Sequence, residues 1–259
     1  MSDPRIALTQ EGPVAIVSIA RPDKLNAFDI EMLDALDAVC TQIERDHAVR
    51  AAVITGAGKA FSAGGDIKAW AAMAPQEFGF DWVRFGHRVF AHLAELRVPV
   101  VAALNGHALG GGLELAACAD VRIAEPQVKL GLPETGLGMV PGWSGTQRLV
   151  QRFGAQVVRR MTLGGEIFTA AEALPLGLVD QLAEAGTARE AALAYAQRIA
   201  ARGPAAVQVV KLMLASATGE SSGTAVETIA SILVAKTGDL KEGVAAFADK
   251  RTPSFKGEW

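Results

Sequence analysis

The chain has 259 residues, half of them hydrophobic and a fifth charged, a composition that is ordinary for a globular protein. A formal net charge of −3 argues against a dedicated nucleic-acid-binding protein, which would carry a strongly basic face. The first residues resemble neither a signal peptide nor an Arg- and Ser-rich transit peptide. We therefore expect a cytoplasmic protein with neither nucleic acid nor a membrane as its partner.

Short apolar runs alternate with helical patterns through the first part of the chain. Strands are predicted at residues 14–19, 51–55, 99–104 and 120–124, because each run is short and largely apolar. Asp29 can cap a helix in which apolar residues recur at helical spacing as far as Ile43. A further helix is predicted after Pro75, from about residue 80 to residue 96. This alternation indicates an α/β architecture with parallel strands.

The stretch between Arg97 and Asp120 holds a single charged side chain, Glu114, and is long enough to suggest a membrane span. However, Pro99 and three consecutive glycines interrupt it. Each glycine costs about 1 kcal/mol in a helix relative to alanine. We therefore predict a strand, a tight turn and a short helix here.

The last part of the chain is predicted to be helical. Residues 169–172 have a capping-box sequence, and Gly177 is placed to end that helix. Helices are then predicted at residues 189–202, 204–216 and 225 to about 248, without a strand between them. The expected organisation is a strand-rich core followed by a helical C-terminal region.

Cysteines and histidines give no sign of a disulfide or a metal site. Cys40 and Cys118 lie among apolar neighbours in predicted helices, as small core residues do. His87 and His92 are five positions apart on one predicted helix, whereas metal-binding pairs on a helix favour closer spacing. We therefore predict no metal site.

Residues 55–66, with the sequence TGAGKAFSAGGD, form a glycine-rich segment directly after a predicted strand. They do not form a P-loop, because Lys59 is followed by Ala60 and no glycine lies five positions before Gly58. They do not match a dinucleotide fingerprint either, because Phe61 occupies the position of the third glycine. The glycines allow the backbone to approach a ligand closely, although a plain strand-to-helix loop is the simpler alternative.

Residues 105–120, with the sequence NGHALGGGLELAACAD, contain three consecutive glycines at the start of an apolar helix. A helix N-terminus presents N–H groups without partners and a partial positive charge. Such a site suits an anion, including an oxyanion that exists only during a reaction. A close-packed turn is the alternative interpretation.

Residues 130–148 carry a single acid, Glu134, among glycines and apolar residues. A lone glutamate in a loop is usually only solvated. The run GWSGT at residues 142–146 is not a nucleophile elbow, because its last glycine is missing.

Taken together, the types, order and spacing of these three segments resemble the enoyl-CoA hydratase/isomerase family of the crotonase superfamily. Residues 105–120 are the most specific part of the resemblance, and residues 249–256 also resemble the family's usual ending. The resemblance implies an α/β fold, with a spiral core of ββα units at residues 1–185. Residues 186–259 would form a helical region that drives assembly into homotrimers or hexamers. It also implies acyl-CoA thioester substrates, with no cofactor other than the coenzyme A of the substrate.

The resemblance also assigns catalytic residues by position. The backbone N–H groups that hold the thioester oxygen correspond to those of Gly65 and Gly111. Alanine is common at the first position in the family, but glycine keeps the N–H group. The two glutamates of the family's hydratases match Glu114, which would activate water for attack at the β-carbon, and Glu134, which would exchange a proton with the α-carbon.

Coenzyme A is placed by the same resemblance. Its nucleotide end is expected along four consecutive residues: Gly65, Asp66, Ile67 and Lys68. Lys24 would lie against the cofactor, and Lys256 of the same or a neighbouring subunit would reach its phosphates, although a surface lysine is usually only solvated. Trp143 and Ser144 replace the small Ala-Gly pair that is common in hydratases. A tryptophan there would narrow the acyl pocket or indicate a specialised or aromatic acyl group, unless it packs away from the pocket.

The leading hypothesis is an enoyl-CoA hydratase that adds water to a 2-enoyl-CoA in fatty acid β-oxidation or a related acyl-CoA degradation. An enoyl-CoA isomerase needs one base, so the presence of two glutamates favours the hydratase. A hydrolase, dehalogenase or decarboxylase on the same scaffold is a further alternative. A non-catalytic scaffold that binds acyl-CoA or RNA is another, but RNA-binding relatives use an added basic helix, for which this chain shows no basic run.

Overall fold

The structure, a computed structural model, describes residues 3–220 and 222–257. These residues divide into two compact units, one that extends to Gln208 and one that begins at Val209. The first unit contains all the strands found among the described residues, in two sheets.

The larger sheet has six strands in the order β1-β2-β3-β5-β7-β10. Their bounds are β1 Ile6–Glu11, β2 Val14–Ile19, β3 Ala51–Gly56, β5 Val100–Leu104, β7 Val121–Ala124 and β10 Gln181–Leu182. The four predicted strands, β2, β3, β5 and β7, are parallel, as expected, and β10, which was not predicted, is parallel to β7. Strand β1 was not predicted and pairs with β2 in antiparallel fashion. Only Gly12 and Pro13 connect these two strands, and so short a connection can join only antiparallel neighbours.

The smaller sheet has four strands in the order β4-β6-β8-β9, and all four were missed from the sequence. Their bounds are β4 Ala60–Ser62, β6 His107–Leu109, β8 Lys129–Gly131 and β9 Ile167–Thr169. A strand of three residues is too short to show a hydrophobic period. The consecutive pairs β3-β4, β5-β6 and β7-β8 each give one strand to each sheet, and helices follow each pair. This repetition confirms the expected ββα units.

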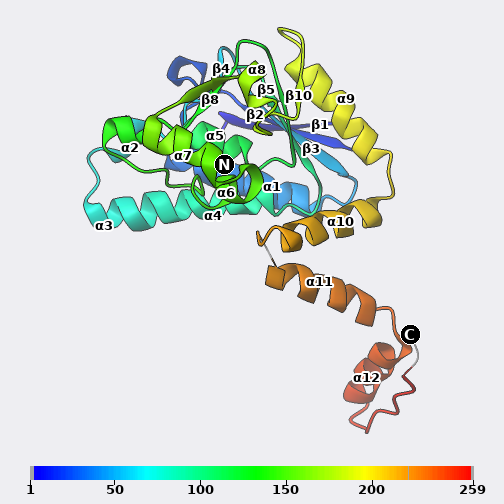
Figure 1. The fold of residues 1–259 in the computed structure, drawn as a ribbon. Helices are drawn as coiled ribbons and strands as arrows, with labels where there is room; N and C mark the ends of the chain where they lie inside the picture. Colours follow the sequence, from blue (N-terminus) through cyan, green and yellow to red (C-terminus); the bar gives the residue numbers. More distant parts are fainter. Residues whose placement is uncertain (1–2, 221, 258–259) are drawn as a thin grey trace. The chain divides into compact units, whose positions relative to one another are not determined.

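Helices cover both faces of the larger sheet (Figure 1). Helix α1 (Ile30–Arg45) packs against β1 and α4, and Asp29 caps it as predicted by accepting a hydrogen bond from Met32 N at 3.1 Å. Helix α9 (Ala188–Ala200) packs against β2, β3, β5 and β7. Its four buried alanines share a second core with the opposite face of the sheet. This packing is the reason that the first unit continues past the boundary expected at residue 185.

The helix predicted at residues 80–96 consists of three successive pieces. They are α3 (Pro75–Glu77), the π-helical segment η2 (Phe78–Arg84) and α4 (Phe85–Ala94). The first unit also contains these shorter elements: η1 Pro22–Lys24, α2 Ile67–Trp70, α5 Gly111–Ala116, η3 Glu134–Leu137, α6 Arg148–Phe153, α7 Ala155–Gly164 and α8 Ala170–Ala173. The predicted capping box of α8 is present at Thr169 and Glu172.

The C-terminal part is helical, as predicted. Helix α10 (Pro204–Ala217) crosses from the first unit into the second, which also holds α11 (Ser222–Val234) and α12 (Gly238–Ala248). The single helix predicted from residue 225 to about 248 was wrong. The Thr237 side chain accepts a hydrogen bond from Leu240 N at 3.2 Å and starts a new helix there. Among the described residues, no helix has the length and apolarity needed to cross a bilayer. The stretch after Arg97 instead forms the predicted strand β5 and short helix α5, with the additional strand β6 between them.

Candidate active site

The two predicted oxyanion segments meet at one edge of the smaller sheet. One follows β4 and the other follows β6, and these strands are parallel neighbours. Parallel neighbours end at the same edge, so their following loops come together. A Cβ atom placed on Gly64, which has a φ of +91°, would lie 2.8 Å from Gly111 N. The two backbones therefore touch at a point where a side chain has no room.

The N–H groups of Gly65 and Gly111 are both available to a ligand. Gly111 is the first residue of α5, so its N–H has no acceptor within the helix. Hydrogen bonds from Phe28 N to Gly64 O (2.8 Å) and from Asp66 N to Phe28 O (2.7 Å) fix the loop on either side of Gly65. Across the described residues, neither glycine N–H donates to a protein group. Both glycines line the same pocket.

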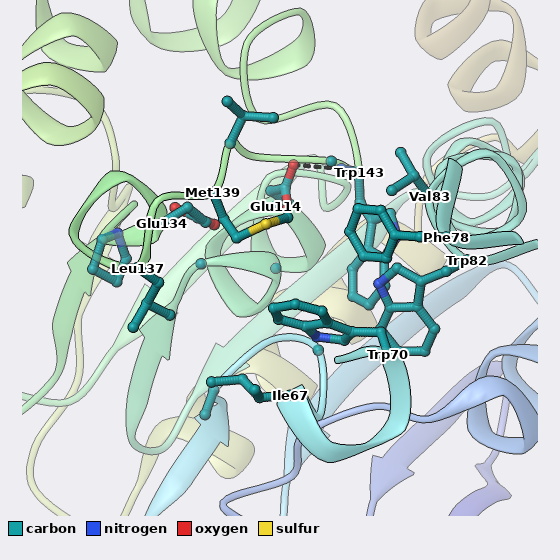
Figure 2. A pocket seen from close by; sticks show the side chains of 17 residues that line it. Ile67, Trp70, Phe78, Trp82, Val83, Glu114, Glu134, Leu137, Met139 and Trp143 are labelled. Atoms are coloured by element: carbon teal, nitrogen blue, oxygen red, sulfur yellow. Dashed lines mark hydrogen bonds between the residues drawn. The ribbon is translucent and has the colours of Figure 1, made fainter. Parts of the chain in front are cut away.

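This pocket has a volume of about 680 Å³ with its open mouth included, and its lining is mostly apolar. Figure 2 shows Phe78, Trp82 and Trp143 gathered on one side of Glu114, with Glu134 and Leu137 on the other side in this view. The pocket thus combines two carboxyl groups with apolar walls and two backbone donors. An apolar pocket with a few convergent polar groups is the usual form of a small-molecule site.

Glu114 is almost fully buried, at 2% exposed, in the first turn of α5. Its Oε1 accepts hydrogen bonds from Trp143 N at 2.7 Å and from Gly145 N at 2.6 Å. Burial, together with the charge of Glu134, raises the pKa of Glu114 to about 8, although the backbone N–H groups around the carboxyl oppose this rise. The carboxyl group is therefore held in a fixed position and favours its protonated form near neutral pH.

Glu134 begins η3, and its carboxyl group lies against the glycine turn before α5. A Cβ atom placed on Gly110 would lie 2.9 Å from Glu134 Oε1. Its Oε2 is buried without a hydrogen-bond partner among the described residues, and burial raises the pKa of Glu134. Since each negative charge disfavours the other, the pair with Glu114 tends to hold one proton between them. One acid and one base in the same pocket can carry out proton transfer in both directions.

Arg21 holds the loop that presents the Gly65 donor. It forms ion pairs with Asp66 at 2.9 Å and with Asp29 at 3.2 Å, and it donates a hydrogen bond to Ala27 O at 2.9 Å. Asp66 also caps α2 by accepting a hydrogen bond from Lys68 N at 3.1 Å. The Asp66 carboxylate and the Asp66 backbone N–H and C=O groups thus all form contacts within the protein, and the contact of Asp66 with coenzyme A stays a prediction. Sequence reasoning missed Arg21, whose only signal was its place at the end of a strand.

The remaining predicted binding residues are spread over the two units. Ile67 lines the pocket, whereas Lys24 and Lys68 are exposed and are not among its lining residues. Lys256 belongs to the second unit, where its backbone N–H donates to Asp239 Oδ1 at 2.8 Å. The structure therefore joins Gly65, Gly111, both glutamates, Ile67 and Trp143 in one pocket, and the roles of the three lysines stay predictions.

Trp143 lines the pocket instead of packing away from it. Three further aromatic residues that the sequence did not single out also line it, namely Trp70, Phe78 and Trp82. They explain why glycine replaces the alanine common at position 65: a Cβ atom there would lie 2.7 Å from Trp82 Cζ2 and 3.4 Å from Trp143 Cη2. Glycine is needed here because the Trp82 ring occupies the space of a methyl group and the Trp143 ring lies in contact with it.

The described residues contain no group of three or more histidine, cysteine, aspartate or glutamate side chains that could hold a metal ion. Cys40 and Cys118 are buried residues, as predicted. The His87 ring lies 3.1 Å from Ser144 Oγ, and His92 lies 2.7 Å from an Asp37 carboxylate oxygen.

Comparison with known proteins agrees with this geometry. Residues 9–258 match the family model described as enoyl-CoA hydratase/isomerase. The chain is 38% identical to the short-chain-enoyl-CoA hydratase of Clostridium acetobutylicum, over 95% of each chain. It is 36% identical to the crotonyl-CoA hydratase of Syntrophomonas wolfei, over 98% of this chain and 99% of the other.

Solved structures show the same fold over nearly the whole chain. The enoyl-CoA hydratase from Bacillus anthracis matches with a TM-score of 0.81 and 35% identity, over 98% of this chain and 100% of the other. DspI from Pseudomonas aeruginosa matches with a TM-score of 0.83 and 34% identity, over 99% and 98%. The chain therefore belongs to the enoyl-CoA hydratase/isomerase family of the crotonase superfamily.

Proposed function

We propose that this protein is an enoyl-CoA hydratase, which adds water reversibly to a 2-enoyl-CoA thioester in fatty acid β-oxidation or a related acyl-CoA degradation. One observation carries the proposal: two buried carboxyl groups lie in an apolar pocket that also contains two N–H groups without acceptors among the described residues. The relatives named as hydratases in Clostridium acetobutylicum and Syntrophomonas wolfei support it.

The two N–H groups would bind the thioester oxygen. Attack of water at the β-carbon moves electrons toward that oxygen, so negative charge grows there as the enolate forms. The Gly65 and Gly111 donors are fixed by the fold and need not reorganise when this charge develops. One donor of this type is worth about 2.7–4 kcal/mol in measured cases. The donors therefore stabilise the transition state more than the substrate.

The two glutamates would complete the addition of water. The Glu114 carboxylate accepts a proton from water while the water oxygen bonds to the β-carbon, and Glu134 gives its proton to the α-carbon. The net result is one water added and one proton moved from Glu134 to Glu114, and the reverse steps eliminate water. The pair shares one proton: addition of water starts with this proton on Glu134 and ends with it on Glu114, the group whose pKa burial raises to about 8. The proton must therefore return to Glu134 before the next addition.

Coenzyme A, assembly and location complete the proposal. We place the nucleotide end of coenzyme A along residues 65–68, with Lys24 against the cofactor and Lys256 of this or a neighbouring subunit near its phosphates. The scheme needs no other cofactor. We also propose a cytoplasmic homotrimer or hexamer. Within the second unit, apolar side chains of α11 and α12 stay exposed, and a neighbouring subunit would cover them: Val226, Ile232, Leu233, Val244 and Phe247.

A substrate panel with product analysis tests the activity. The purified protein is given crotonyl-CoA, the corresponding 3-enoyl-CoA and saturated acyl-CoA thioesters, and the products are identified by mass spectrometry. We expect 3-hydroxybutyryl-CoA from crotonyl-CoA at a rate far above that of any other reaction. Double-bond migration without added water would favour an isomerase, and release of free coenzyme A would favour a hydrolase. Tight acyl-CoA binding without turnover would favour a scaffold.

A further inference from the structure

The carbons of the acyl group beyond the β-carbon must lie on one side of the pocket. The thioester oxygen is placed at the Gly65 and Gly111 donors, and the reacting carbons are placed between the two glutamates. Ile67 and Leu137 line the pocket and are 48% and 64% exposed. Because coenzyme A is placed along residues 65–68, they mark the open rim through which the thioester enters. The rest of the acyl group therefore extends away from this rim, toward the aromatic wall.

Trp143 is part of this aromatic wall, and its ring contacts both donor segments. A Cβ atom placed on Gly111 would lie 2.8 Å from its ring atoms Cε3 and Cζ3, and one placed on Gly65 would lie 3.4 Å from Cη2. The indole ring thus occupies the space directly behind the two donor glycines. Its exposure of only 3% shows that it fills the inner end of the pocket instead of its mouth.

The position of this ring is fixed from several sides. Its centroid lies 5.2 Å from that of Trp82 and 5.0 Å from that of Phe90, both at angles that are favourable for aromatic pairs. Gly86 on α4 also lies against the ring, so closely that a Cβ atom would overlap it. The backbone N–H of Trp143 is tied to Glu114 Oε1 at 2.7 Å. A ring held in this way has no free space into which it could swing to admit a longer chain.

A second hollow lies next to the pocket and shares five lining residues with it: Phe78, Val83, Met139, Val140 and Gly142. Because these residues line both spaces, they form part of the wall between them. Trp82 and Trp143 line the pocket and not this hollow, so the hollow does not extend the pocket behind the two indole rings.

We infer that Trp143 ends the acyl pocket just beyond the reacting carbons and restricts the enzyme to 2-enoyl-CoA thioesters with short acyl groups, of about four to six carbons. This inference rests on the proposed hydratase function. In this inference one residue sets the length of the acyl group, because its indole ring occupies the space that the methylene groups of a longer chain would fill.

The test measures kcat/KM for crotonyl-CoA and for trans-2-decenoyl-CoA with the full-length protein and its Trp143→Ala variant. For the natural protein we expect crotonyl-CoA to be preferred by about tenfold or more. In the variant the ratio should shift toward decenoyl-CoA by about tenfold or more, the gain expected from burying two or more further methylene groups. The ratio is informative because both substrates use the same glutamates and donors, so a general loss of activity in the variant cancels.

Two further variants make the test decisive. Trp143→Leu keeps more of the side-chain volume and replaces Trp143→Ala if that variant does not fold. Leu137→Ala removes an apolar side chain at the rim and should leave the ratio between the substrates within about twofold. The inference is overturned if the natural protein hydrates decenoyl-CoA as efficiently as crotonyl-CoA, or if folded Trp143 variants keep the natural ratio. Failure to hydrate any enoyl-CoA would instead overturn the proposed function.

Discussion

Replacing Glu114 with glutamine should stabilise the protein, and this gain should grow with pH. The glutamine side chain has nearly the shape of a protonated glutamate, and its carbonyl oxygen can accept the same hydrogen bonds from Trp143 N and Gly145 N. It differs from glutamate in having no proton to lose. Any difference between the two proteins that depends on pH therefore reports the cost of ionising a buried carboxyl group.

The sign and size of the effect follow from the pKa of Glu114, which burial raises from 4.5 to about 8. Since the folded state holds this proton more tightly than the unfolded state, stability is greatest below pH 4.5 and falls as pH rises toward 8. Between pH 5.5 and 8.5 the free energy of unfolding of the natural protein should fall by about 3 kcal/mol. The Glu114→Gln variant should not show this loss. For a chain of this size, that free energy corresponds to a difference of about 6–12 °C in Tm.

The assay is the Tm of both proteins, measured by calorimetry or intrinsic fluorescence at half-unit steps between pH 5.5 and 8.5. Glu166→Gln is the control, because Glu166 is exposed and its ion pair with Arg160 lowers its pKa. The Tm difference between this variant and the natural protein should therefore change little with pH, and with the opposite sign. A constant Tm difference between Glu114→Gln and the natural protein across this range would refute the claim that burial holds a proton on Glu114.

The remaining predictions concern activity. With crotonyl-CoA as substrate, kcat/KM should fall above about pH 8, because the proton shared by the two glutamates is lost there; a flat profile to pH 9.5 would argue against a shared proton. Gly65→Ala should lower kcat by about tenfold or more, because its methyl group would meet Trp82 Cζ2 at 2.7 Å. Adding Trp82→Leu should restore most of the lost kcat, and a double variant with no recovery would disprove the steric cause. Arg21→Ala should lower kcat more than it raises KM, because Asp66 loses the ion pair that holds the donor loop; a change in KM alone would count against this positioning role.

The sequence indicated two glycine segments that could approach a ligand, and the resemblance to the family assigned the donor glycines and the two glutamates within and beside them. Glycines after a strand, a glycine triplet before an apolar helix and two glutamates at a fixed spacing are all visible without a structure, and the structure brings Gly65, Gly111, Glu114 and Glu134 into one pocket. Four of the longer strands were predictable because a short, largely apolar run is a signal that one strand carries alone. Strand β1, with the sequence IALTQE, lacks that signal and was missed.

Features that depend on contacts between distant segments could not be predicted. The three-residue strands of the smaller sheet have no period of their own and exist because neighbouring strands pair with them. The ion pairs of Arg21 with Asp29 and Asp66 join residues up to 45 positions apart. The need for glycine at position 65 becomes clear only when Trp82 and Trp143 are seen beside it. By contrast, the break before α12 had a local signal in the capping residue Thr237.

The most direct test of the catalytic account is the rate of crotonyl-CoA hydration by Glu114→Gln and Glu134→Gln, each compared with the natural protein at pH 7.5. Both variants keep the shape of the pocket but lose one proton-transfer group, so circular dichroism should be unchanged while kcat falls by about 10²–10⁴-fold in each. If either folded variant hydrates crotonyl-CoA as fast as the natural protein, that glutamate does not take part in the chemistry and the proposed mechanism is wrong.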